Sequence, residues 1–153
     1  MKLSTRGRYG LRAMFDLAMN QSQGPIPLNE IASRQNISEA YLEQLFATIR
    51  KSGLVKSVRG AYGGYLLATS PDKISVGQIL RALEGNIAPA DCVRDDDDGI
   101  ECISADACVT RIVWEKIRDS INQVIDSITL EDMVREHKSI CKETEYTNVK
   151  CTS

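Results

Sequence analysis

The sequence has a single histidine, a single tryptophan and no apolar run near the length of a membrane span. About 18 consecutive apolar residues would be needed to cross a bilayer, so a membrane protein is not expected. The opening MKLSTRGRYG carries charges without an apolar segment behind them, unlike a secretory signal. One histidine argues against a Ser/His/Asp nucleophilic set, and no phosphate-binding glycine loop follows a strand and opens a helix. We expect a cytoplasmic protein that is not an enzyme and has no small-molecule substrate.

What the 153 residues do contain is an ordinary globular composition, 42% hydrophobic and 26% charged. Its charge is unevenly distributed. Residues 1–67 hold nine Lys and Arg against four Asp and Glu, a net charge of +5. The remaining residues hold ten against 17, a net charge of −7. A basic N-terminal part followed by an acidic C-terminal part is typical of a nucleic-acid binder with a separate control region.

Apolar residues at helical spacing predict four helices, each bounded by capping or breaking residues. They cover residues 8–20, 28–36, 39–51 and 76–84. Between the third and fourth helices, two short strands flank a glycine-rich loop at 60–64. Three helices followed by such a hairpin predict a winged helix-turn-helix. The expected fold class is therefore mainly α with a small β-wing, and residues 1–84 form the DNA-binding domain.

The second helix of a helix-turn-helix presents its N-terminal residues to base edges in the major groove. Gln44 can pair with adenine, and Glu43 can accept a hydrogen bond from cytosine. An arginine at the hairpin tip is suited to a narrow minor groove. The simpler alternative is a solvated helix face beside a hairpin that binds nothing. The residues expected to contact a double-stranded DNA operator are Tyr41, Glu43, Gln44, Arg50, Ser57 and Arg59.

All five cysteines lie in the last 62 residues, and their odd number argues against a disulfide framework. Three of them, Cys92, Cys102 and Cys108, fall in an aperiodic segment at 85–108 beside a helix start, whose positive end favours thiolate. Thiolates suit an iron–sulfur cluster or zinc, and the lack of CxxC pairs favours a labile cluster. Redox sensing and incidental thiols are the alternatives. Cys141 and Cys151 lie in a polar tail and are expected to be incidental.

A long helix is predicted from about Asp106, because apolar residues recur at steps of three and four. The seam consists of Val113, Ile117, Ile121, Val124 and Ile128. With a further short helix from Thr129, residues 106–138 are expected to form dimerisation helices, followed by a flexible tail at 139–153. The alternative is a seam packed only on its own domain. A homodimer is favoured because dimers of this architecture read two half-sites.

Three segments carry a resemblance to a known family: MKLSTRGRYGLRAM, SEAYLEQLFATIRKSGLVKSVRGAYGGYLL and TLEDM. The chain resembles the iron–sulfur cluster regulator (IscR-like) family of dimeric winged-helix transcription factors over roughly residues 1–135. The resemblance implies a homodimeric repressor of cluster-biogenesis genes, in which a [2Fe-2S] cluster on each subunit tunes operator choice. The family's reading residues fall on Tyr41, Gln44, Arg50 and Arg59, its discriminating glutamate on Glu43, and its cysteine ligands on Cys92, Cys102 and Cys108.

The chain departs from this family at one ligand. Members typically have a histidine three residues after the third cysteine, and this position holds Arg111. The fourth ligand is left open between Glu101, Asp106, His137 and a group from the partner subunit. The spacer between the first two cysteines is also longer than is usual. Three alternative functions follow: a cluster-free repressor of cysteine metabolism, a nitric-oxide-sensing repressor, and a zinc or thiol redox module at 85–153.

Overall fold

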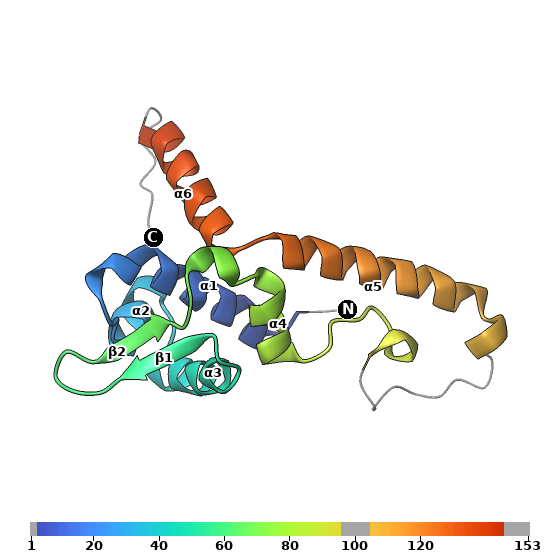
Figure 1. The fold of residues 1–153 in the computed structure, drawn as a ribbon, viewed down its shortest axis with the longest axis horizontal. Helices are drawn as coiled ribbons and strands as arrows, with labels where there is room; N and C mark the ends of the chain where they lie inside the picture. The colour runs from blue at the N-terminus through green and yellow to red at the C-terminus, as the bar shows by residue number, and fades with distance from the viewer. Residues whose placement is uncertain (1–2, 96–104, 146–153) are drawn as a thin grey trace.

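The computed structural model describes residues 3–95 and 105–145. Its first four α-helices and one hairpin pack together, and we call this part, residues 3–84, the head (Figure 1). The helices are α1 (Thr5–Asn20), α2 (Leu28–Gln35), α3 (Glu39–Lys51) and α4 (Val76–Glu84). The hairpin pairs β1 (Val55–Val58) with β2 (Gly64–Leu67) in antiparallel register, from Val55 opposite Leu67 to Val58 opposite Gly64. The predicted winged helix-turn-helix is confirmed. We call β1, β2 and the loop between them the wing.

The core of the head forms where the apolar faces of α1, α2 and α3 meet the wing. Leu42 and Phe46 of α3 are fully buried, at the helical spacing that the sequence shows. The ring of Phe46 also packs edge-on against Tyr65 of β2, with 4.9 Å between the ring centroids. Each large side chain buried in this way contributes roughly 1.5–3 kcal/mol. This packing fixes α3 against the wing and turns the opposite face of α3 to solvent.

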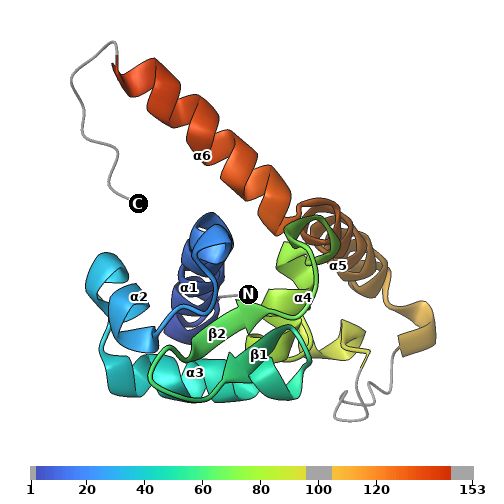
Figure 2. The same ribbon diagram turned by 60° about the vertical axis from the view of Figure 1, so that its left-hand side comes forward.

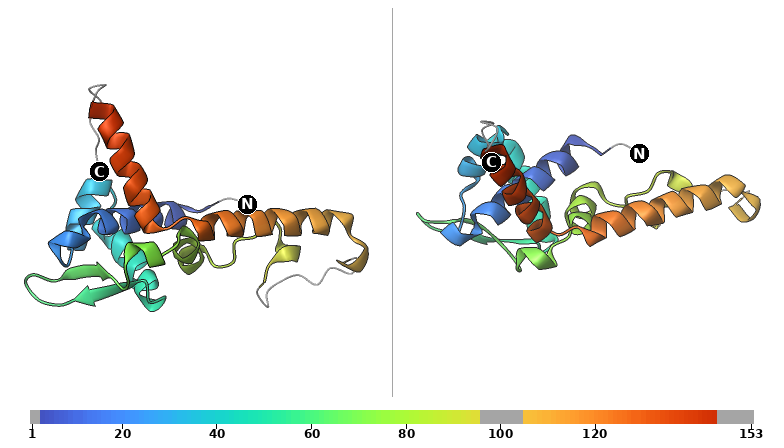
Figure 3. Two further views of the ribbon diagram at one scale, coloured as in Figure 1. Left: turned by 45° about the horizontal axis from the view of Figure 1, so that its top comes forward. Right: turned by 90° about the horizontal axis from the view of Figure 1, so that it is seen from above.

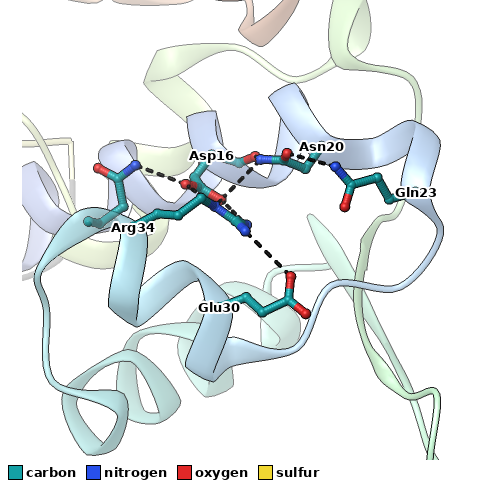
Figure 4. A network of polar contacts seen from close by, with 6 residues as sticks. Asp16, Asn20, Gln23, Glu30 and Arg34 are labelled. Carbon is teal, nitrogen blue, oxygen red and sulfur yellow. Dashed lines mark hydrogen bonds and ion pairs between the residues drawn. The ribbon is translucent and has the colours of Figure 1, made fainter. Parts of the chain in front are cut away.

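A buried ion pair joins α1 to α2 (Figure 4). Asp16 of α1 is only 2% exposed, and its carboxylate lies 2.7 Å from the guanidinium of Arg34 on α2. The side-chain amide of Gln35 donates a second hydrogen bond to the same carboxylate over 2.9 Å. A buried charge is stable only when it is paired and hydrogen-bonded. The network therefore holds the first two helices of the helix-turn-helix in one relative orientation.

The C-terminal part consists of α5 (Val109–Ser127), which projects from the head, and α6 (Leu130–Glu145), which packs on α1 (Figures 1 and 3). Their junction is fixed to the head by a β-bridge between Ser75 and Thr129. In this bridge Val76 donates its N–H to the carbonyl of Ile128 over 2.8 Å. The base of α5 is thus attached to the first residues of α4. No helix within the described ranges is long and apolar enough to cross a membrane.

The boundary between the last helix and the tail differs from the one expected. The short helix expected after Thr129 has 16 residues and continues through 139–145, where a flexible tail was expected. It is longer because Met133, Val134 and His137 recur at helical spacing and lie toward α1, so the helix gains contacts beyond its first turns. Cys141 is consequently a helix residue. Residues 146–153, which include Cys151, lie outside the described residues.

Candidate nucleic-acid interface

The start of α3 is set by a side-chain cap. Ser38 accepts a hydrogen bond at its hydroxyl from the N–H of Tyr41 over 3.2 Å, satisfying a donor that the helix itself leaves free. Because Leu42 and Leu45 face the core, Glu43 and Gln44 are left exposed on the outer face. The structure therefore presents these two predicted reading residues to solvent. That they contact bases remains a prediction.

Tyr41 is braced by α1. Its ring packs edge-on against Tyr9 with 6.0 Å between centroids, and its hydroxyl lies 3.5 Å from that of Thr5. The first turn of α1 is itself capped from α4, since the carboxylate of Glu84 accepts hydrogen bonds from the N–H groups of Ser4 and Gly7. A carboxylate at a helix N-terminus also interacts favourably with the helix dipole. The orientation of Tyr41 is therefore set by contacts that reach the end of α4.

The structure brings two other predicted residues together. The guanidinium of Arg50, in the last turn of α3, donates to the hydroxyl of Ser57 on β1 over 3.3 Å. Figure 2 shows α3 and the β1–β2 hairpin side by side, in agreement with their packing. Arg59 is exposed in the loop beyond β1 and does not join this contact. The predicted DNA-contacting residues beyond Tyr41 thus lie at three places. Glu43 and Gln44 are on the outer face of α3, Arg50 and Ser57 are where α3 meets β1, and Arg59 is in the wing loop.

The segment that carries Cys92 lies along α5. The guanidinium of Arg118 donates to the carbonyl of Val93 over 3.0 Å and to the carboxylate of Asp95 over 3.1 Å. One turn further along, Asn122 donates to the carbonyl of Ile87 over 3.3 Å. These contacts fix the short helical turn Asp91–Val93, with the partly exposed Cys92 thiol, against the projecting helix.

Cys108 occupies the N-cap position of α5 and is partly exposed. Its sulfur lies 3.1 Å from the hydroxyl of Thr110. Hydrogen bonding to that hydroxyl lowers the pKa of the Cys108 thiol, and the backbone N–H and the positive charge of Arg111 lower it further. Arg111, which stands where the resembling family has histidine, therefore stabilises a thiolate here. Cys108 and Arg111 line a cavity of about 470 Å³ together with Asp106 and Glu115.

The described residues do not by themselves assemble the predicted ligand set. Within 3–95 and 105–145, no group of three His, Cys, Asp or Glu side chains is placed to hold a metal ion. Cys102 and Glu101 lie outside the described residues. Of the fourth ligands considered, Asp106 lines the cavity at Cys108. His137 lies on α6 with its ring 5.4 Å from that of Phe15. Helix α6 follows the C-terminal end of α5, whereas Cys108 caps the N-terminal end of α5.

Sequence reasoning missed the side chains that position the cysteine segment. Arg118 and Asn122 are four residues apart and hence on one face of α5, which is the only signal that the sequence offers. Their main acceptors are the backbone carbonyls of Val93 and Ile87. Every residue has a backbone carbonyl, so the type of residue does not show which carbonyl accepts a hydrogen bond. The attachment of the cysteine segment to α5 therefore could not be predicted from one sequence.

Comparison with known proteins identifies the family. The model of the Rrf2 family, described as "Iron-dependent Transcriptional regulator", matches residues 3–136. The HTH-type transcriptional regulator CymR of Bacillus subtilis (strain 168) is 47% identical over 133 residues, which are 87% of this chain and 89% of CymR. The HTH-type transcriptional regulator IscR of Pectobacterium carotovorum is 41% identical over 134 residues, which are 88% of this chain and 79% of that protein.

Solved structures give the same result. The structure of CymR, the global cysteine regulator of B. subtilis, matches with a TM-score of 0.74 at 46% identity, and the match covers 89% of this chain and 98% of that one. IscR of T. potens matches with a TM-score of 0.72 at 51% identity and covers 89% and 88%. With this agreement in sequence and in fold, the chain belongs to the Rrf2 family of DNA-binding transcriptional regulators and is not an enzyme.

Proposed function

We propose that the chain is a homodimeric repressor that binds operator DNA through α3 and the wing of each subunit. The observation that carries this proposal is the uncovered apolar face of α5. No residue of α5 is buried. Val109 is 74% exposed and Val124 56% exposed, although both are large apolar residues. An apolar stripe of this length on a projecting helix is the signature of an interaction surface.

One residue of the predicted seam of α5 packs on the chain's own head, and the others face solvent. Ile121 packs with Ile125 against Val76, Leu80 and Ile87 of the same chain. The other members remain exposed: Val113, Ile117, Val124 and, at the end of the helix, Ile128. Packing on the chain's own head therefore accounts for only part of the seam. The exposed part is available to α5 of a second copy, which would place two heads on one duplex.

In this proposal the chain contacts DNA through residues at the three places described above. Gln44 and Glu43 are free to meet base edges in the major groove, where the hydrogen-bond pattern distinguishes all four base pairs. Arg50 and Arg59 carry the positive charge that phosphates attract, which positions the protein without specifying sequence. Because Arg50 is bonded to Ser57, α3 and the wing approach the duplex as one unit.

The genes under control are those of cysteine metabolism in our proposal. It is the cluster-free alternative to a regulator of cluster biogenesis. The sequence relatives favour it, since CymR is 47% identical to the chain and the IscR of P. carotovorum is 41% identical. Among the solved structures the order is reversed, with IscR of T. potens at 51% identity and CymR at 46%. CymR is described as the global cysteine regulator of B. subtilis.

Iron–sulfur sensing is the second candidate, and the thiols favour it. Cys92 and Cys108 would hold a [2Fe-2S] cluster together with Cys102, and a bound cluster would supply a redox-active group. The chain's own residues suit this use. Thr110 and Arg111 lower the pKa of the Cys108 thiol and so favour the thiolate, the form that binds metal, and Arg118 holds the Cys92 segment to α5.

One experiment separates the two candidates. The full chain is purified anaerobically, its absorption spectrum and its iron, sulfide and zinc contents are measured, and its affinity for a selected operator is compared before and after treatment with a chelator. A cysteine-metabolism repressor free of clusters would be colourless and bind equally in both states. Visible absorption that is lost in Cys92→Ala and Cys108→Ala, but retained in Cys141→Ala, would establish the cluster instead. Zinc in a colourless protein would support a zinc module.

A further inference from the structure

The tip of the wing is a tight turn whose shape is set by its backbone. Gly63 donates its N–H to the carbonyl of Gly60 over 3.0 Å, which closes the turn around Ala61 and Tyr62. Gly60 has a φ of +116°, a conformation that residues with a side chain rarely adopt. A side chain at Gly63 would collide with the carbonyl oxygen of Val58. The two residues between the glycines are therefore held at the apex of the hairpin.

Tyr62 stands at this apex with its side chain almost fully in water. It is 94% exposed, more than any other exposed large hydrophobic residue in the described ranges. The other described tyrosines, Tyr9, Tyr41 and Tyr65, all pack on the core. Within the described residues Tyr62 makes no hydrogen bond and no ring contact. An aromatic ring placed in this way adds little to the stability of the fold and is free to contact a partner.

The charge around the ring indicates the class of partner. Residues 54–71 contain Lys56 and Arg59 and no Asp or Glu. Both cationic side chains are exposed. Because the wing is joined to α3 through Arg50 and Ser57, its apex lies on the same body as the helix that reads the major groove. A cationic hairpin with an apical ring in this setting fits the minor groove of duplex DNA.

We propose that the ring of Tyr62 enters the minor groove beside Arg59 and makes the protein select base pairs that lack a minor-groove amino group. The proposal rests on operator binding by the wing, as argued above. In the minor groove, G·C pairs differ from A·T pairs by the N2 amino group of guanine, which stands on the groove floor. A flat ring can approach the floor closely only where this group is missing. Arg59 favours the same sequences, because A·T tracts narrow the groove and deepen its negative potential.

The test changes the minor groove and leaves the major groove as it is. A duplex is selected from a random pool with the wild-type chain, and each A·T pair is replaced in turn by 2,6-diaminopurine·T, which adds the N2 amino group. In a second series each G·C pair is replaced by inosine·C, which removes it. Dissociation constants are measured by fluorescence anisotropy at fixed salt for the wild type and for Tyr62→Ala, Tyr62→Phe and Lys56→Ala.

We expect the wild type to lose about tenfold in affinity when diaminopurine lies under the wing, as for the loss of an aromatic contact. Tyr62→Ala should bind the unmodified duplex about tenfold more weakly and lose much less than the wild type with diaminopurine, because only Arg59 still responds to the minor groove. Tyr62→Phe should behave like the wild type, because the ring makes the contact. Lys56→Ala, the matched control on the same hairpin, should weaken binding to every duplex by one common factor.

Two results would overturn the proposal. In the first, Tyr62→Ala keeps the wild-type sensitivity to diaminopurine. In the second, Tyr62→Phe loses as much as Tyr62→Ala, which would mean that the hydroxyl binds a phosphate. Failure of the proposed operator binding is distinct from both, because the wild type would then yield no selected duplex.

Discussion

The guanidinium of Arg50 and the hydroxyl of Ser57 lie 3.3 Å apart, so the last turn of α3 is hydrogen-bonded to the first strand of the wing. Both side chains are exposed, so we expect the contact to add little to the stability of the fold. Its effect is geometric, because it sets the position of the wing relative to the face that carries Gln44. In the proposed complex the major-groove and minor-groove contacts must be in register on one duplex, and this bond would hold them in that register.

Removing the contact should therefore weaken DNA binding more than it weakens the fold. We expect Ser57→Ala to lower operator affinity by about 1 kcal/mol, the typical contribution of one hydrogen bond, with little change in melting temperature. Arg50→Ala should lower it further and reduce the salt slope by about one unit, since a phosphate contact is lost as well. Anisotropy titrations at several salt concentrations measure both effects. Unchanged affinity in Ser57→Ala would show that α3 and the wing act separately.

The outer face of α3 should control which operators are bound. Gln44→Ala should reduce discrimination at one base-pair position by roughly 1–3 kcal/mol, as for a lost bidentate pair. Glu43→Ala should broaden the set of sites, because a carboxylate facing the groove is satisfied only by a donor such as cytosine N4 and disfavours other bases. Binding to a library of single-base operator variants decides this. A uniform loss across all variants would mean that these side chains contact no base.

The ion pair between α1 and α2 should be among the most sensitive points of the head. Arg34→Ala leaves the carboxylate of Asp16 buried with only amide partners, and we expect a loss of about 3 kcal/mol in the free energy of unfolding. Glu30→Ala removes the outer and exposed partner of the same arginine and should cost less than about 0.5 kcal/mol. Urea titration compares the two. Equal and small losses would show that the buried pair is not needed.

Residue pattern predicted the head well because its determinants are local. Each of these determinants depends only on residues close together in the sequence. They are the apolar spacing of α3, the Ser38 cap, and the capping box formed by Ser75 and Gln78. The extent of α6 was missed because its contacts come from Phe15 on α1, far away in the sequence. The same limit applies to the site. Gln44 could be placed from its helix position alone, whereas the bond between Arg50 and Ser57 depends on how α3 meets β1.

Cys108 should react as a thiolate at lower pH than an ordinary cysteine. Its pKa is lowered by the Thr110 hydroxyl, then by the N–H and charge of Arg111, so alkylation of the reduced, metal-free chain should reach half its maximal rate at a lower pH at Cys108 than at an ordinary cysteine. Thr110→Val removes the first of these causes and should shift the midpoint upward. Peptide-resolved mass spectrometry after iodoacetamide pulses reports each cysteine separately. A midpoint that does not move in Thr110→Val would contradict the assigned cause.

In the proposed assembly two copies pair through α5 and place two heads on one duplex. Sedimentation of the protein with a selected operator, combined with hydroxyl-radical footprinting, tests it most directly. We predict two chains per duplex and two protected half-sites spaced by about one helical turn or a multiple of it. Ile117→Asp with Val124→Asp, both on the exposed face of α5, should give a folded monomer without this footprint. A single chain on a single protected site, or a double variant that still sediments as a dimer, would contradict the account.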